Sequence, residues 1–327
     1  MGAPLLAVRE LRTAFQAEEG VVQAVRDVSF SLTAGETLAL VGESGCGKSV
    51  TALSIMGLLP PNGRITGGRI ELEGRDLLQL KRSALRDVRG KRIAMVFQDS
   101  MTSLNPLLTV GRQITESLET HLGLSGREAR RRAAALLDEV GVPEAEKRLR
   151  QYPHQLSGGL RQRVAVAIAI ASDPEVLIAD EPTTALDVTI QAQLLELLRR
   201  EQEERGMALL LITHDLGVVA GMTDRLCVMY AGRIVEHGPT EAVFAEPRHP
   251  YTAGLLESVP RIDEKLERRL ASIPGVPPRL WNLPPGCPFR PRCRKALGRC
   301  DHEDPSLETV EQGHEVACWA AVREPAA

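Results

Sequence analysis

The sequence predicts an α/β fold with a largely parallel sheet, and two observations support this prediction. First, short apolar runs bounded by turn residues alternate with longer stretches of helical periodicity, as in sheets whose strands are joined by helices. Second, a Gly-rich turn follows one apolar run and leads into a helix expected at about 48–59. The expected strands are 37–41, 92–97, 176–179 and 208–213, followed by a terminal hairpin of 226–230 and 233–236.

The region between Gln98 and Ser172 departs from this alternation, because helical periodicity dominates it. We interpret it as a helical subdomain inserted into the α/β core, with helices at 110–122, 127–140 and 159–171. Prolines become frequent after Glu246, which indicates an irregular, loop-rich extension. We therefore expect a core at 1–98 and 172–245, a helical subdomain at 99–171 and a C-terminal extension at 246–327.

Composition limits the classes of function. The 327-residue chain has 43 acidic and 40 basic residues and a formal net charge of -3, so no global positive field favours nucleic acid. The first ten residues contain no basic segment followed by a long apolar run, and the sequence has no run of about 18 apolar residues. We expect a soluble, intracellular protein that reaches a membrane only through a partner.

The turn after the strand at 37–41 matches the phosphate-binding pattern G-x-x-x-x-G-K-[ST], with a helix after it. That context disfavours the alternative of a Gly-rich turn that matches by chance. Glycines let the backbone approach phosphates, and successive N–H groups at a helix N-terminus bind an anion. Lys48 supplies a charge for the β- and γ-phosphates of ATP, and the Ser49 hydroxyl can coordinate Mg²⁺. The loop consists of Gly42, Glu43, Ser44, Gly45, Cys46, Gly47, Lys48 and Ser49.

A second motif is the apolar run at 176–179, which ends in the two carboxylates of Asp180 and Glu181. Asp180 at the tip of such a strand can hold the Mg²⁺ shell, and Glu181 can orient or deprotonate the attacking water. In isolation, a solvated acidic strand end is the simpler interpretation. Together with the P-loop, the pair predicts hydrolysis of MgATP.

The segment 156–163, Leu-Ser-Gly-Gly-Leu-Arg-Gln-Arg, opens a helix of the insertion and resembles the signature motif of the ATP-binding cassette (ABC) family, usually written L-S-G-G-Q. The resemblance implies the RecA-like P-loop NTPase core of an ABC ATPase. Ser157, Gly158 and Gly159 suit a second phosphate-binding helix start. By resemblance, they serve the ATP held by the P-loop of an opposing subunit, so that two cassettes close head to tail around two ATP molecules.

Other motifs of the ABC family follow in the expected order. By resemblance, Gln98 is the Q-loop glutamine that senses Mg²⁺ and water, and His214 is the switch histidine. The segment 184–187, which ends in Asp187, resembles the D-loop. Phe15 resembles the aromatic residue that stacks on adenine, although an aromatic residue near a strand end is more often part of a core.

Departures from the general ABC pattern resemble the oligopeptide/dipeptide importer ATPases. Leu160 replaces the signature glutamine, and those ATPases usually have an apolar residue there. The segment 98–106 is close to their Q-loop, with Ser100 in place of a common proline, and 248–252 matches their stretch after the core. The resemblance covers the chain from about Leu6 to Cys318. Nickel importers share much of it, so the transported solute stays open.

Four of the six cysteines lie in the C-terminal extension, at Cys287, Cys293, Cys300 and Cys318. Because the cytosol disfavours structural disulfides, metal binding is the first interpretation. Four thiolates suit a tetrahedral Zn²⁺ or a [4Fe–4S] cluster, and buried thiols without a metal are the third alternative. Some peptide-importer ATPases carry an iron–sulfur cluster in this extension, and the resemblance therefore favours [4Fe–4S] over Zn²⁺.

The hypothesis that follows from the resemblance is an ATPase subunit at the cytoplasmic face of a membrane that energises peptide import. The implied partners are a second ABC ATPase subunit, with a heterodimer preferred to a homodimer, two membrane-spanning permease subunits and an extracytoplasmic solute-binding protein. A soluble ABC ATPase acting on nucleic acid is disfavoured, because the chain has one cassette and no sustained heptads. A regulatory module that barely hydrolyses ATP is disfavoured by the presence of Gln98, Glu181 and His214.

Overall fold

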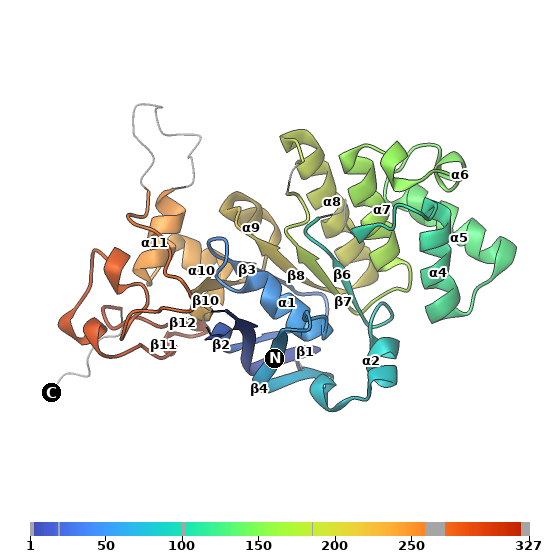
Figure 1. Ribbon diagram of the computed structural model, residues 1–327. Helices are drawn as coiled ribbons and strands as arrows, with labels where there is room; N and C mark the ends of the chain where they lie inside the picture. Colours follow the sequence, from blue (N-terminus) through green and yellow to red (C-terminus); the bar gives the residue numbers. More distant parts are fainter. Residues whose placement is uncertain (1–2, 19, 100–102, 185, 259–271, 322–327) are drawn as a thin grey trace. The chain divides into compact units, whose positions relative to one another are not determined.

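The computed structural model describes residues 3–18, 20–99, 103–184, 186–258 and 272–321. The chain divides into two compact units (Figure 1). The P-loop unit contains Leu6–Ser31, Thr37–Arg75 and Thr213–Ala327, and the signature unit contains Met1–Leu5, Leu32–Glu36 and Asp76–Ile212. Ser100 of the expected Q-loop segment and Ala185 of the expected D-loop lie outside the described residues.

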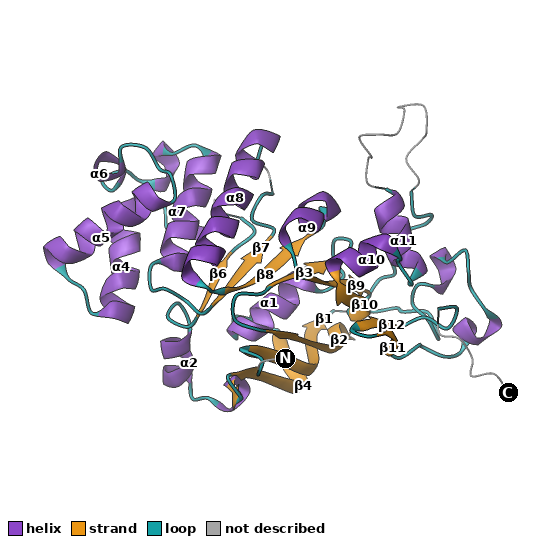
Figure 2. Ribbon diagram, turned by 180° about the vertical axis from the view of Figure 1, so that it is seen from behind, coloured by secondary structure: helices purple, strands orange, loops and turns teal. Residues whose placement is uncertain are grey.

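The first sheet, most of which belongs to the P-loop unit, has four strands in the order β2-β1-β4-β5 (Figure 2). The strands are β1 (Leu6–Ala17), β2 (Gly20–Leu32), β4 (Gly63–Leu72) and β5 (Arg75–Asp76). β1 and β4 run antiparallel, with Phe15 opposite Gly63. In β2, the buried residues Val28, Phe30 and Leu32 alternate with more exposed polar ones. This sheet was not among the expected strands, because the expectation relied on continuous apolar runs.

The P-loop unit also contributes strands in the order β11-β12-β10-β9-β3 to a second sheet. These strands are β3 (Thr37–Val41), β9 (Arg225–Tyr230), β10 (Arg233–Pro239), β11 (Glu308–Glu311) and β12 (His314–Val316). β3 pairs parallel with β9, and β9 pairs antiparallel with β10, so the expected hairpin is confirmed. Its description as terminal was wrong, since β12 pairs with β10 and β11 pairs with β12. The C-terminal extension thus covers the open edge of β10.

The signature unit holds three parallel strands in the order β8-β7-β6. They are β6 (Ile93–Val96), β7 (Val176–Asp180) and β8 (Ala208–Thr213), and every residue in them is buried. Continuous apolar runs are typical of parallel strands that are covered on both faces. The predicted α/β class is therefore confirmed, while the antiparallel pairs of β10, β11 and β12 make the second sheet mixed.

The helical insertion lies in the signature unit, where α4, α5 and α7 contact one another and α6 contacts α5 (Figure 1). Val110, Ile114 and Leu118 form the buried stripe of α4, as its periodicity predicts. All three expected helices are confirmed to within one residue at each end. The helices of this unit are α2 (Arg82–Val88), α4 (Val110–Leu122), α5 (Gly126–Glu139), α6 (Ala145–Arg148), α7 (Gly158–Ile170) and α8 (Val188–Arg205), with short 3-10 turns at Leu77–Gln79 and Pro153–Gln155.

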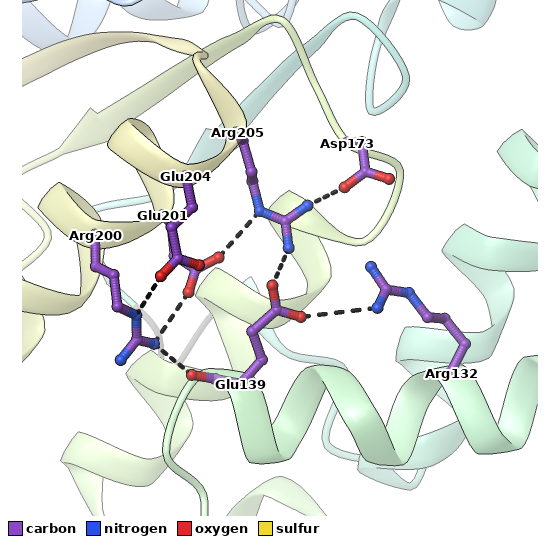
Figure 3. A network of polar contacts seen from close by, with 7 residues as sticks. All are labelled: Arg132, Glu139, Asp173, Arg200, Glu201, Glu204 and Arg205. Atoms are coloured by element: carbon purple, nitrogen blue, oxygen red, sulfur yellow. Dashed lines mark hydrogen bonds and ion pairs between the residues drawn. The ribbon is translucent and has the colours of Figure 1, made fainter.

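A network of arginines and carboxylates joins α5, α8 and Asp173 (Figure 3). Arg205, the last residue of α8, pairs with Glu201 on its own helix at 3.0 Å, and also with Glu139 of α5 and Asp173. Arg200 donates to the backbone oxygen of Glu139 at 2.6 Å. Glu201 is fully buried and Arg205 is largely buried, so the charge of Glu201 is paired where solvent screens it least. The network fixes the end of α8 against α5.

The P-loop unit contains α1 (Lys48–Met56), α9 (Leu216–Met222), α10 (Thr240–Ala245) and α11 (Pro250–Glu257), with 3-10 turns at Arg290–Arg292 and Gly298–Asp301. α1 ends earlier than expected, because Gly57 takes a left-handed φ of 59° and its N–H group caps the helix. The C-terminal extension is more ordered than expected, since Tyr251 and Phe289 join a core cluster with Tyr230 of β9. Within the part of the chain that is described, no helix is both long and apolar enough to cross a membrane.

Candidate nucleotide site

The P-loop connects β3 to α1 with glycines at positions that other residues would disturb. Gly42 has a φ of 152°, and a Cβ there would lie 2.3 Å from the backbone oxygen of Met229. Gly47 has a φ of 110°, and a Cβ there would lie 2.5 Å from the backbone oxygen of Ala24. Gly47 is the N-cap of α1 and brings no side-chain oxygen to the first N–H groups of the helix. The turn therefore suits an external anion better than a side-chain cap.

Lys48 is buried, and its ammonium group is held within the P-loop itself. Lys48 Nζ donates to the backbone oxygen of Gly42 at 2.7 Å and to that of Glu43 at 3.2 Å. Ser49, predicted to bind Mg²⁺, is half-buried in the first turn of α1, while Ser44 and Gly45 at the tip of the loop are exposed. Cys46 is buried, and burial raises the pKa of its thiol. Cys46 thus supports the loop by packing.

Glu43 is the P-loop residue that contacts the C-terminal extension. Its carboxylate accepts two hydrogen bonds from the guanidinium group of Arg292, at 2.6 and 2.8 Å. Its backbone N–H donates to the Tyr251 hydroxyl at 2.8 Å. The hydrogen bonds that Arg292 donates to Glu43 raise the pKa of Arg292 above its ordinary value, whereas burial raises the pKa of Tyr251. Arg292 was not predicted from the sequence, because no local pattern indicates a contact with a residue so distant in the chain.

In the signature unit, the fold brings Gln98 and Glu181 together. Gln98 follows β6 and its Nε2 donates to Glu181 Oε2 at 3.0 Å, and Thr184 Oγ1 donates to the same oxygen at 3.0 Å. Asp180, at the end of β7, is buried. Glu181 has a φ of 45°, a left-handed conformation that costs a non-glycine residue about 1–3 kcal/mol and is often found at functional sites. The two hydrogen bonds orient the Glu181 carboxylate.

The signature segment starts α7 with a capped and exposed turn. Ser157 is the N-cap, and its Oγ accepts a hydrogen bond from the Leu160 N–H at 3.4 Å. Ser157 and Gly158 are exposed, and a Cβ on Gly158 would meet nothing closer than 4.0 Å, although one on Gly159 would lie 2.8 Å from Ile190. Asp187, the expected D-loop aspartate, is exposed and caps α8 in the same way, accepting from the Ile190 N–H at 3.0 Å. Both turns face solvent in the single chain.

The two remaining site predictions fall in the P-loop unit. His214 is exposed directly after β8, and the neighbouring Asp215 caps α9. Phe15 is half-buried on β1, and its ring lies against Gly63, where a Cβ would be 2.6 Å from Phe15 Cε1. The position of the ring agrees with packing on β4, and its predicted stacking on adenine stays a prediction.

The four cysteines of the C-terminal extension are free thiols. Burial raises the pKa of Cys287 to about 11 and also raises that of Cys293 and Cys318, and the charge of Cys300 adds to all three shifts. The backbone N–H of Cys287 also donates to the backbone oxygen of Cys300 at 3.0 Å. This hydrogen bond places Cys287 beside Cys300. However, among the described residues no group of three or more potential ligands is arranged to hold a metal ion.

Comparison with known proteins decides the family. Residues 25–184 match the family described as "ABC transporter", and residues 235–300 match "Oligopeptide/dipeptide transporter, C-terminal region". The dipeptide transport ATP-binding protein DppD of Bacillus subtilis is 52% identical over 316 residues, which cover 96% of this chain and 94% of that protein. The chain belongs to the ABC transporter family, in its oligopeptide/dipeptide branch. It is therefore an ATPase of the ABC type, as the P-loop and signature segment predicted.

Further comparisons agree with this family. The oligopeptide transport ATP-binding protein OppD of Salmonella typhimurium is 51% identical over 320 residues, which cover 98% of this ABC ATPase and 95% of that protein. Among solved structures, a dimeric post-hydrolysis state of the ATP-binding cassette MJ0796 bound to ADP and Pi matches with a TM-score of 0.65 and 29% identity. The match covers 72% of this chain and 98% of that one. The fold is thus that of an ABC cassette with additional residues.

Proposed function

We propose that this ABC ATPase energises the import of oligopeptides or dipeptides through a membrane transporter. The observation that carries the proposal is the match of residues 235–300 to the oligopeptide/dipeptide transporter C-terminal region, because an ABC core alone serves many solutes. The relatives named for dipeptide and oligopeptide transport cover nearly the whole chain at about half identity. Two permease subunits and an extracytoplasmic solute-binding protein would complete the transporter at the cytoplasmic face of the membrane.

The proposed chemistry divides binding and hydrolysis among the described motifs. Lys48 and the N–H groups at the start of α1 bind the β- and γ-phosphates. Mg²⁺, which neutralises charge that develops on the phosphates, would be held by Ser49, Gln98 and Asp180. Glu181 accepts a proton from the attacking water, and the hydrogen bond from Gln98 holds its carboxylate in place.

A composite site in a dimer is the second part of the proposal. Ser157 and Gly158 are exposed at a helix N-terminus, which suits the γ-phosphate of an ATP held by another cassette. The solved relative MJ0796 is a dimer with ADP and Pi. We propose the same use of the signature here, with a second, similar cassette as the preferred partner and a homodimer as the alternative. The helical subdomain at 99–171 would transmit the motion at Gln98 to the permease. The proposed core comprises residues 1–98 and 172–245, and the proposed extension comprises residues 246–327.

The test is ATP hydrolysis and peptide uptake by the transporter reconstituted in liposomes, with wild-type chain or Glu181→Gln. General-base catalysis contributes on the order of 10²–10⁴-fold, so Glu181→Gln should lose about that factor in turnover while still binding MgATP. Equal turnover would refute the role of Glu181. Uptake of nickel without uptake of labelled peptide would refute the proposal that peptides are the transported solute.

We propose a [4Fe–4S] cluster on the four cysteines of the extension, Cys287, Cys293, Cys300 and Cys318. Four cysteines form a complete donor set for a cluster or for Zn²⁺. Burial disfavours free thiolates here, but a bound metal reverses this effect because its charge stabilises them. Protein purified anaerobically should be brown and contain iron, and Cys300→Ser should remove both properties. Colourless protein with one zinc ion per chain would refute the cluster and would indicate a zinc site.

A further inference from the structure

The P-loop of this chain contains a carboxylate next to the place where phosphates are expected. Glu43 is its second residue, directly after Gly42. A negative charge there opposes the binding of a polyanion such as ATP, because like charges repel strongly where solvent is partly excluded. The Glu43 side chain is about one quarter exposed, at 26%, so water alone only partly screens its charge. Another group has to neutralise it.

Arg292 neutralises this carboxylate from the C-terminal extension. The pair is bidentate, at 2.6 and 2.8 Å, and only 4% of the Arg292 side chain is exposed. Arg292 Nε donates to the backbone oxygen of Pro274 at 3.0 Å, and the guanidinium group lies 5.8 Å from the ring centroid of Tyr230. These contacts hold the planar guanidinium group of Arg292 in one orientation toward the Glu43 carboxylate.

A second contact from the extension holds the backbone of the same residue. Tyr251 of α11 is fully buried, and its hydroxyl accepts the Glu43 N–H at 2.8 Å. The Tyr251 ring packs against Tyr230 and Phe289, with centroids 4.7 and 5.4 Å apart. A cavity of about 280 Å³ also separates residues 43–46 of the P-loop from residues 277–281 of the extension. The extension therefore contacts both the side chain and the backbone of Glu43.

We propose that Arg292 and Tyr251 are positioning residues of the nucleotide site, through which the C-terminal extension neutralises Glu43 and fixes the start of the P-loop for MgATP. The inference rests on the proposed role of the P-loop as the nucleotide site. It gives the extension a part in nucleotide binding that is independent of any metal on its cysteines. Both residues act through Glu43.

The test measures the Kd for MgATP of the full-length chain by calorimetry, with the rise in thermal midpoint on adding MgATP as a second readout. Arg292→Met should weaken binding about tenfold, because it leaves the Glu43 carboxylate without its charge-assisted partner. Adding Glu43→Gln to Arg292→Met should restore part of the affinity by removing the uncompensated charge. Tyr251→Phe, which keeps the ring in the core, should weaken binding roughly threefold, because it removes one hydrogen bond.

The matched control is Arg233→Met. Arg233 also binds the extension to the sheet, through Asp304 at 2.6 Å, and it is likewise largely buried, but its partner is not in the P-loop. Its Kd should equal that of the wild type. Wild-type affinity in Arg292→Met, or an equal loss in Arg233→Met, would overturn the proposal. If Arg292→Met does not fold, wild-type affinity in Tyr251→Phe would overturn the proposal instead.

The P-loop assignment itself has a separate control. Lys48→Ala should weaken MgATP binding on the order of 10²-fold whether or not the extension matters. If Lys48→Ala binds like the wild type, the P-loop assignment fails. If Lys48→Ala loses binding and the Arg292 and Tyr251 variants keep it, only the positioning role fails.

Discussion

The helix start after the P-loop and the helix start after the signature segment are both rich in glycine, but they are built differently. At α1, the N-cap is Gly47, and the buried ammonium group of Lys48 lies on carbonyls of its own loop. At α7, the N-cap is Ser157, which is exposed and already caps its own helix. The first start brings a charge and an N-cap residue without a side chain, and the second brings a hydroxyl on an open surface. The contrast suits one start for a nucleotide held by the same chain and the other for a nucleotide of a partner.

The largest effect expected from this contrast follows from Lys48→Ala. The variant removes the ammonium group at the first start, and charged hydrogen bonds contribute about 1.5–3 kcal/mol each, so affinity for MgATP should fall on the order of 10²-fold. The measurement is the Kd of the single chain. Lys81→Ala, an exposed lysine before α2, is the control and should bind like the wild type. Unchanged MgATP affinity in Lys48→Ala would contradict the proposed difference between the N-termini of α1 and α7.

A glycine pair sharpens the comparison at the level of folding. Gly42→Ala forces a Cβ to within 2.3 Å of the Met229 backbone oxygen at a φ of 152°, and we expect a loss of about 1–3 kcal/mol of unfolding free energy. Gly158→Ala meets nothing closer than 4.0 Å and should change stability by about 0.5 kcal/mol or less. Urea unfolding of both variants is the measurement. Equal losses would mean that the signature turn is as constrained as the P-loop.

Ser157→Ala tests whether the second start works on a partner. In the assembled dimer, we expect ATP turnover to fall roughly tenfold, as for the loss of one hydrogen bond to a charged group. The Kd of the isolated chain for MgATP should stay unchanged, because its own nucleotide does not meet its own signature. Ser125→Ala, at the N-cap of α5, is the control. A weaker Kd in the isolated Ser157→Ala chain would contradict a role in trans.

The sequence was informative where burial is complete and contacts are local. Strands 37–41 and 208–213 were predicted to the residue, since continuous apolar runs between turn residues leave few alternatives. Half-buried strands such as β1 and β4 carry no such run and were not predicted. The P-loop was found because its spacing is fixed by phosphate geometry and lies within a few residues, and the signature segment was found through its resemblance to the ABC family.

Contacts between distant residues were out of reach of the same reasoning. Arg292 and Glu43 lie 249 positions apart, and neither carries a local mark of the other. Gln98 and Glu181 are 83 positions apart, and only the family resemblance suggested that both serve one reaction. The strands β11 and β12 were not predicted either, because strands of three or four residues with charged side chains look like loop in a sequence. Such pairings are decided by the tertiary fold.

The smallest effect expected at neutral pH concerns His249, which reaches the P-loop indirectly through Tyr251. His249 Nδ1 accepts the Tyr251 N–H at 3.0 Å, and Tyr251 in turn holds Glu43. Burial lowers the pKa of His249 to about 3, against about 6.5 when unfolded, so the unfolded chain binds one more proton between these values. Stability that is present above pH 6.5 is therefore lost as the pH falls toward 3, at up to about 1.4 kcal/mol per pH unit.

His249→Asn keeps a side-chain acceptor for the Tyr251 N–H and removes the titration. Unfolding free energy measured by urea should change little at pH 7.5 and should fall less steeply than in the wild type below pH 6.5. Glu236, which accepts the His249 N–H at 3.0 Å, and its partner His314 are present in both proteins, so their contributions cancel in the difference. Protonation of His249 removes the acceptor for the Tyr251 N–H, and Tyr251 contacts Glu43 of the P-loop, so the affinity of the wild type for MgATP should weaken in acid. The turn at Ser157 should be unaffected. Parallel acid profiles for the two proteins would show that His249 is not the group through which acid reaches the P-loop.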